Sequence, residues 1–223
     1  MIDWTPFILT LKLALLTTII LFCIAIPLGY FLSKRKNIFT IFLETLFGLP
    51  LVLPPTVLGF YILITLGKNS LIGDFLSEHF DIQLVFSFSG LLIGSIIYSF
   101  PFMIQPLQAG FSTIPEDLIH AAMLMGKKEI TILLKVVLPN MKSAILSGLV
   151  LTFAHTIGEF GVVLMIGGNI PDKTKVASIA IYDYVESMQY DNAHEYAFIL
   201  LCFSFTILFL LYYFNRKNNF NLK

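Results

Sequence analysis

Five apolar runs dominate the 223-residue chain, and each is longer than the roughly 20 residues that a helix needs to cross a bilayer core. Backbone donors and acceptors find no water inside lipid, so such a run has to satisfy them within its own helix. Charged residues make up only 13% of the sequence, against about 25% in soluble domains. We therefore expect an all-α integral membrane protein with about five transmembrane helices, at roughly residues 7–32, 38–66, 84–109, 143–167 and 193–214.

Lysine and arginine are distributed unevenly between the connections of these runs. When the runs are threaded as five crossings, only Lys12, Lys68, Lys173 and Lys175 of the fourteen basic residues fall on one side. The positive-inside rule then places the N-terminus outside and the C-terminus in the cytoplasm. The cytoplasmic set consists of Lys34, Arg35, Lys36, Lys127, Lys128, Lys135, Lys142, Arg216, Lys217 and Lys223.

The chain shows no internal repeat, linker or low-complexity tract, so we expect residues 1–223 to form a single transmembrane domain. The first run lacks a positively charged lead and a small-residue cleavage site, and we expect it to be a retained helix. Residues 168–192 form the second outer connection and contain a possible short helix at 176–188.

A charged, patterned segment at residues 111–142 joins the third and fourth runs on the predicted cytoplasmic side. Thr113 and Glu116 have the spacing of a capping box at a helix start. Gly126 suits the end of that helix, and Pro139 marks the turn into the fourth run. The pattern alone also fits an interfacial helix that lies on lipid. The apolar face of the short helix is formed by Leu118, Ala121, Ala122 and Met125.

This segment resembles the EAA loop of ABC-importer permeases, which reads Glu-Ala-Ala, three residues, Gly, nine residues, then Ile-x-Leu-Pro. Here Ala121 and Ala122 precede Gly126, and Val136-x-Leu138-Pro139 follows nine residues later. His120 replaces the Glu of the motif and Val136 replaces the Ile. The resemblance implies a type I importer permease whose loop sits, as a coupling helix, in a groove of an ATP-binding subunit. We expect that contact to involve His120, Ala121, Ala122, Met125, Gly126 and Pro139.

The resemblance also implies a set of partners. In this family a cytoplasmic ATP-binding cassette subunit, present in two copies, binds ATP and Mg, so no cofactor is expected in this chain. An extracytoplasmic binding protein selects the substrate and delivers it. Five helices are few for enclosing a gated path, so we expect a homodimer, with a heterodimer left open. We expect the protein in the prokaryotic cytoplasmic membrane, where its partner is the lipid bilayer. No nucleic-acid partner is expected.

Two further stretches resemble the molybdate branch of these permeases. One runs from Gly48 to Gly59, and the other begins at Gly158-Glu159-Phe160-Gly161 and continues to Thr174. Sulfate permeases are similar, but they typically carry Tyr where Phe160 stands. The resemblance therefore implies a molybdate permease that works by alternating access, with tungstate, sulfate or thiosulfate as alternative substrates.

The physical chemistry of these stretches can be examined separately. Pro50, Pro54 and Pro55 remove backbone donors and prevent a straight helix through the second run. Irregular backbone inside a membrane is tolerated only where it is buried in protein or lines a cavity. The prolines therefore indicate either a packing kink or a wall of a translocation path.

Glu159 is an acid within the fourth run, roughly 24 Å along a helix that starts near residue 143. A carboxylate repels an oxyanion, so we expect Glu159 to hold a gate or a subunit contact, with His155 as its nearest candidate partner. Gly158 and Gly161 permit close backbone approach. The residues expected at the path or gate are Pro50, Pro54, Pro55, Thr152, His155, Gly158, Glu159 and Gly161.

Other classes of function receive less support from the sequence. It contains no HExxH, GxSxG, cysteine cluster or phosphate-binding glycine loop, so we expect neither an enzyme nor a metal site. Any ATP hydrolysis then belongs to a separate subunit. A secondary transporter driven by an ion gradient is the rival of a different class, since such folds also contain broken helices.

Overall fold

The computed structural model describes residues 2–35 and 37–220. Lys36 and Lys223, which entered the charge argument, lie outside the described residues. All regular secondary structure in the described part is helical, as the sequence predicts. Three helices are long and apolar enough to cross a membrane alone, and two bent helix pairs bring the number of candidate spans to as many as five.

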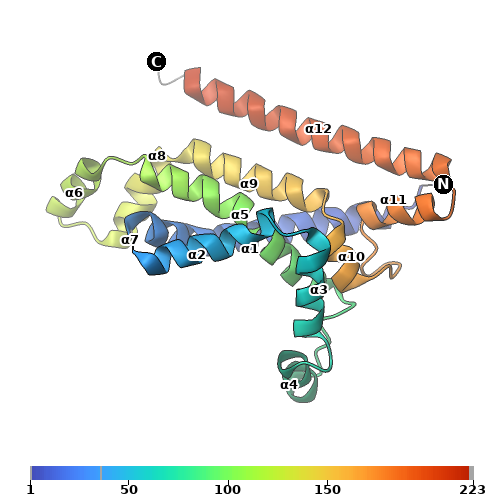
Figure 1. The fold of residues 1–223 in the computed structure, drawn as a ribbon. Helices are drawn as coiled ribbons and strands as arrows, with labels where there is room; N and C mark the ends of the chain where they lie inside the picture. The colour runs from blue at the N-terminus through green and yellow to red at the C-terminus, as the bar shows by residue number, and fades with distance from the viewer. Residues whose placement is uncertain (1, 36, 221–223) are drawn as a thin grey trace.

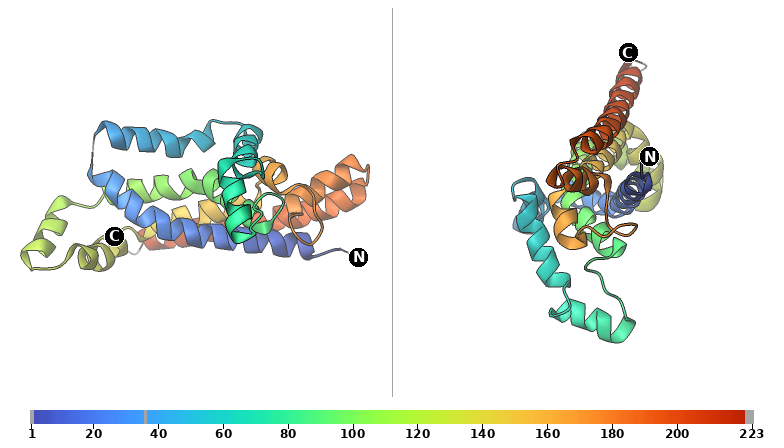
Figure 2. Two further views of the ribbon diagram at one scale, coloured as in Figure 1. Left: turned by 90° about the horizontal axis from the view of Figure 1, so that it is seen from below. Right: turned by 90° about the vertical axis from the view of Figure 1, so that its right-hand side faces the viewer.

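Three helices pack side by side at the centre of the molecule (Figures 1 and 2). They are α1 (Thr5–Lys34), α5 (Phe88–Ser112) and α9 (Lys142–Ile157). Large apolar side chains such as Leu21, Met103 and Leu107 are fully buried. Small residues allow the backbones to approach closely, because a Cβ at Gly110 would lie 2.5 Å from that of Ala144.

The second predicted span is sharply bent. It consists of α2 (Ile38–Gly48), the 3₁₀ turn η1 (Leu49–Leu51) and α3 (Pro55–Leu66), with an angle of 111° across the break. The break falls on the proline-rich stretch, so the prediction that a straight helix cannot run through it is confirmed. In Figures 1 and 2 α3 leaves the central bundle sideways and carries α4 (Leu71–Phe80) at its far end.

The fourth span is not the continuous helix predicted over 143–167. It ends at Ile157 and resumes as α10 (Gly161–Gly167). Gly158 and Gly161 are poor helix formers, and Phe160 has a non-helical backbone with φ −131°. On the other side, α9 meets the preceding helical segment, Glu129–Asn140, at an angle of 80°. Glu159 therefore lies in a break and not within a helix.

The two ends of the bundle have different structures (Figure 1). One end holds α6 (Glu116–Leu124), α7 (Glu129–Ile132), the π-helical turn η2 (Leu133–Val137) and α8 (Leu138–Asn140). The N-terminus lies at the opposite end, next to α11 (Ala177–Glu186). That helix matches the short outer helix expected at 176–188.

The last helix, α12 (Tyr190–Phe220), runs along α9 and α11 back toward the α6 end (Figure 1). This arrangement places the predicted cytoplasmic loop and the last turns of α12 on the same side, as the charge pattern predicts. The side of α12 away from the bundle exposes large apolar residues, including Phe198, Leu201 and Phe205. Such a surface suits lipid or another membrane-embedded chain.

The close contact of α5 with α9 leads to a stability prediction. Gly110→Ala places a methyl group against the Cβ of Ala144, which cannot rotate away. We expect a loss of about 1–3 kcal/mol, measured as a lower melting temperature of the detergent-solubilised protein. Gly48→Ala is the matched control, because an added Cβ there meets nothing within 4 Å. Equal melting temperatures for both variants would contradict the proposed close packing.

Candidate translocation site and coupling loop

Glu159 occupies the break between α9 and α10, where its side chain is only 3% exposed. Its Oε2 accepts a hydrogen bond of 2.6 Å from Ser95 Oγ of α5. Its backbone carbonyl accepts a second one, also 2.6 Å, from Ser178 Oγ of α11. Its Oε1 is buried and has no hydrogen-bond partner among the described residues. One residue thus joins three elements at the point where the span is interrupted.

His155 is not the partner of Glu159, contrary to the sequence-based expectation. Its Nδ1 lies 3.0 Å from Ser99 Oγ, which in turn lies 2.9 Å from Thr156 Oγ1. The ring stacks on Phe102 with a centroid distance of 3.9 Å. Because Ser95 and Ser99 are one helical turn apart on α5, each meets a different hydrogen-bond partner on the opposite segment, and the pair aligns α5 with α9.

A cavity of about 520 Å³ opens beside this break. Five of the residues predicted for the path line it, namely Pro55, His155, Gly158, Glu159 and Gly161, together with Thr56 and Tyr98. The remaining three do not line it. Pro50 is buried in η1, Pro54 is exposed ahead of α3, and Thr152 is buried in α9 with no hydrogen-bond partner for its Oγ1 in the described chain.

The breaks of the second and fourth spans touch each other. A Cβ at Gly161 would lie 2.8 Å from the Cβ of Pro55, and a Cβ at Gly59 would lie 2.8 Å from that of Met165. Helices α3 and α10 therefore pack almost backbone to backbone, one helical stretch against the other. A displacement of one has to move the other, because no side-chain layer separates them to absorb it.

The cytoplasmic loop has a well-defined helix end. Gly126 adopts φ +70°, which favours glycine, and its N–H donates to Met123 O over 2.9 Å while Lys127 N–H donates to Ala122 O over 3.3 Å. This is a Schellman end, as the position of Gly126 predicts. Pro139 lacks an N–H and would clash with a regular preceding turn, and the wider π turn η2 lies directly before it.

Two expectations for this loop are wrong. Thr113 does not cap α6, because it ends α5 and its Oγ1 donates to Gly110 O. Ala122 does not face outward: it is 8% exposed and belongs to the same apolar core as Ile132 and Val137. The helix turns Ala122 inward to hold the loop together. Its exposed surface consists of Glu116, Asp117, Leu118, His120, Ala121, Met123, Leu124 and the capping residue Met125.

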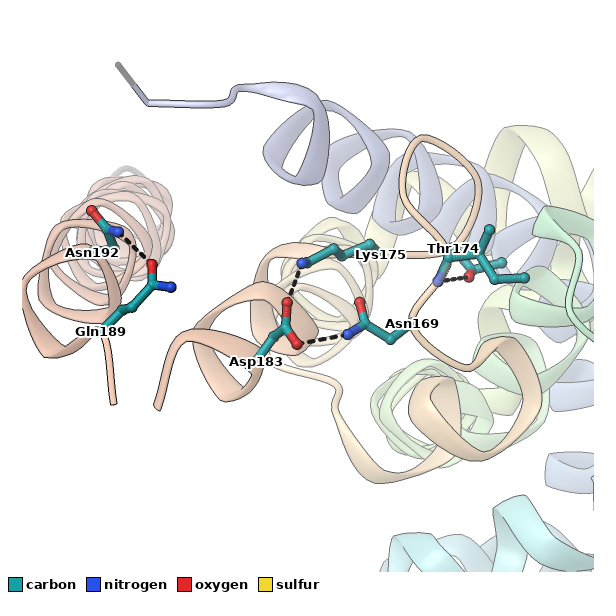
Figure 3. Close-up of polar contacts among 7 residues, drawn as sticks. Asn169, Thr174, Lys175, Asp183, Gln189 and Asn192 are labelled. Carbon is teal, nitrogen blue, oxygen red and sulfur yellow. Dashed lines mark hydrogen bonds and ion pairs between the residues drawn. The ribbon is translucent and has the colours of Figure 1, made fainter. Parts of the chain in front are cut away.

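The outer loop between α10 and α11 is held by polar contacts (Figure 3). Asp183 accepts a 2.9 Å hydrogen bond from Asn169 Nδ2 and forms an ion pair with Lys175. The buried Thr174 donates to Gly167 O over 2.7 Å and accepts from Ile170 N–H over 3.2 Å. Because its charge is paired with Asp183, Lys175 is a poor candidate for attracting an anion.

Sequence reasoning missed several residues of this site. Ser95, Ser99 and Ser178 supply the hydrogen bonds that hold the break, and Glu44 of α2 bonds to Gln108 of α5. The spacing of Ser95 and Ser99 was a usable signal, because two hydroxyls one turn apart mark a polar stripe on an apolar helix. Ser178 lies in a connection and gave no such signal.

Residues 21–220 match the family model described as "Binding-protein-dependent transport system inner membrane component". The chain belongs to this family. A "Molybdenum transport system permease protein ModB" of Azotobacter vinelandii is 43% identical over 92% of this chain and 90% of its own length. A "Putative molybdenum transport system permease protein" of Bacillus subtilis is 33% identical over 93% of this chain and 92% of its own.

A solved structure supports the architecture independently. A bacterial ABC transporter involved in the import of the acidic polysaccharide alginate matches with a TM-score of 0.78 at 17% identity, covering 96% of this chain and 78% of that one. The chain therefore has the fold of an ABC-importer permease. As a member of the binding-protein-dependent transport family it is a multi-pass protein of the inner membrane, and the family is not itself an ATPase.

The hydrogen bond from Ser95 leads to a testable prediction. Ser95→Ala leaves Glu159 with neither carboxyl oxygen bonded by a side chain, and a buried unsatisfied group costs about 1–3 kcal/mol. We expect reduced substrate uptake in cells at normal membrane abundance. Ser112→Ala on the same helix is the control, because Ser112 Oγ donates only within its own helix, to Gln108 O. Wild-type uptake by the Ser95→Ala variant would contradict a role for this bond.

Proposed function

We propose that two copies of this chain form the membrane path of a molybdate importer. Two cytoplasmic ATP-binding subunits, which hold ATP and Mg, would drive it, and an extracytoplasmic binding protein would supply the ion. The observation that carries a transport role is the contact of two broken spans, at Pro55 and Gly161, beside a cavity within the membrane. The choice of molybdate is supported by the relatives named as molybdenum permeases, which match over nearly the whole chain.

The arrangement of helices suggests how the two ends communicate. Helix α9 begins directly after the cytoplasmic loop and ends at the break that holds Glu159. Its 16 residues span about 24 Å. A shift of the loop on nucleotide binding would displace this rigid helix, and α10 would carry α3 with it through the contact of Gly161 with Pro55. The cavity would then open alternately to either side, which is alternating access.

The cavity favours brief binding of an anion over tight capture. Its described lining contains neutral polar groups, from Thr56, Tyr98 and His155, together with the acid Glu159, and it includes no lysine or arginine. Neutral hydrogen bonds are weaker than charge-assisted ones. Selection among tetrahedral oxyanions would then rest with the binding protein, which fits a permease that offers only a transient path.

A second candidate substrate is sulfate. The "Sulfate transport system permease protein CysT" of Salmonella typhimurium is 32% identical, but over 75% of this chain and 60% of its own length. The lower identity and coverage place molybdate first. Family membership also favours an ATP-driven importer over the ion-gradient transporter considered from sequence.

Uptake measurements test the proposed substrate. Cells that lack this chain are expected to lose radiolabelled molybdate uptake at nanomolar concentration and to regain it with the gene restored. Unlabelled tungstate should compete nearly as well as molybdate, and sulfate much less. Restored uptake that sulfate suppresses better than molybdate does would assign the chain to sulfate instead.

The corrected orientation of the cytoplasmic helix predicts different effects for two neighbouring alanines. Ala121→Trp adds bulk to the exposed surface, so we expect a folded permease that no longer couples substrate to ATP hydrolysis, measured as loss of binding-protein-stimulated ATPase activity in proteoliposomes. Ala122→Trp should instead lower protein yield and melting temperature, because Ala122 is buried. Ala121→Ser is the control. Wild-type stimulation in Ala121→Trp would place the ATPase contact elsewhere.

A further inference from the structure

Glu44 is an acid at membrane depth that the translocation site described above does not use. It lies six residues after the start of α2 at Ile38, or roughly 9 Å along the helix from its cytoplasmic end. Its neighbours Ile41, Phe42 and Leu46 are exposed apolar residues, as expected in a membrane span. Glu44 itself is exposed on the surface of the single chain.

Two glutamines of α5 share this region with Glu44. Gln108 Nε2 donates a hydrogen bond to Glu44 Oε1. Gln105 lies one turn earlier and is exposed, and a cavity of about 230 Å³ is lined by all three polar residues together with Phe47 and Ile104. The only ion pair in the described part of the chain is between Lys175 and Asp183, so Glu44 is not neutralised by a described basic side chain.

The position of these groups excludes lipid as their neighbour. A carboxylate and a primary amide exposed to hydrocarbon are costly, and intramembrane acids face protein or a wet cavity. The face of α2 and α5 that holds Glu44, Gln105 and Gln108 therefore borders protein or water in the assembled membrane complex.

The same face of α5 leads to the cavity at the break. Tyr98 lines the outer cavity and Gln105 the inner one, and these residues are seven positions, or about two helical turns, apart. They lie on one side of the helix. The two cavities thus follow one another along α5, with Glu159 near the outer and Glu44 near the inner.

We propose that Glu44 is a tethered carboxylate that occupies one of the two amide N–H donors of Gln108 on the inner part of the path, so that a transported tetrahedral oxyanion finds that donor taken and is released. This inference rests on the proposed function. An oxyanion has acceptors only and needs donors to remain bound. The Glu44 oxygen already accepts the Gln108 N–H, and its negative charge repels a dianion at close range. Together these effects disfavour retention of the ion on the cytoplasmic half of the path.

Binding of labelled molybdate to the complete complex tests this inference. The complex of permease and ATP-binding subunits is assayed in nanodiscs by equilibrium binding, without nucleotide or binding protein, so that retention by the permease is measured. Glu44→Ala removes both the acceptor that occupies Gln108 Nε2 and the negative charge. We expect it to retain molybdate on the order of tenfold more tightly than wild type, since the Gln108 donor is free and the like-charge repulsion is gone. Its uptake rate at saturating substrate should fall while the half-saturating concentration stays unchanged.

A second substitution separates charge from packing. Gln108→Leu removes the donor, so adding it to Glu44→Ala should lower the gain in retention to the part that comes from the lost charge. Glu44→Asp keeps the charge and should behave as wild type. Melting temperatures of all variants are measured in parallel, because a purely structural link between α2 and α5 would change stability and leave retention unaffected.

The outcomes distinguish the inference from the function on which it rests. Molybdate uptake by wild-type cells tests the proposed function alone. With that uptake intact, equal molybdate retention by Glu44→Ala and wild type would overturn the inference. An equal gain in Glu44→Ala and in its double variant with Gln108→Leu would also overturn it, because the Gln108 donor would then have no part.

Discussion

Satisfaction of backbone hydrogen bonds inside lipid is the constraint on which the rest of this structure depends. The second and fourth spans predicted from sequence are interrupted, at residues 52–54 and 158–160, and each break has a local solution. In the second span Pro50, Pro54 and Pro55 have no N–H to satisfy, and Leu49 O accepts from the two N–H groups inside the break, those of Val52 and Leu53. In the fourth, Ser178 bonds the carbonyl that the helix leaves free at Glu159. Because the breaks also pack against each other, neither exposes irregular backbone alone.

The same constraint explains why polar residues concentrate on the inner surfaces of the central bundle. Ser95, Ser99, Thr152 and Thr156 are all buried, although each is a polar residue in an apolar environment. Hydrogen bonds across α5 and α9 compensate part of that cost and fix how the helices are aligned. A packed seam of this kind favours movement of α9 as a rigid unit, with bending confined to Met141 and to the break at Gly158.

Much of the fold could be predicted from sequence because hydropathy and proline act locally. The run lengths located α1, α5 and α12, the three prolines located the first break, and Gly126 located the end of α6. Features that depend on long-range packing could not be predicted. The pairing of Glu159 with Ser95 joins residues 64 positions apart. Ala122 faces inward because it packs in one apolar core with Ile132 and Val137. The helical periodicity of the sequence defines the apolar face of α6 but does not say which residues cover that face.

The two acids beside α5, Glu44 of α2 and Glu159 of the break after α9, bear on the proposed direction of transport. Neither cavity has a lysine or arginine in its described lining, and each has one glutamate. Basic groups would strengthen the binding of a dianion, and tighter binding slows release. A path lined by neutral donors, with acids at two depths, would keep the affinity for the ion low at every position. Under the proposed function, directionality would come from outside the path, through the binding protein on one face and nucleotide on the other. The permease would then contribute little affinity of its own, and its two acids would prevent prolonged binding of the ion.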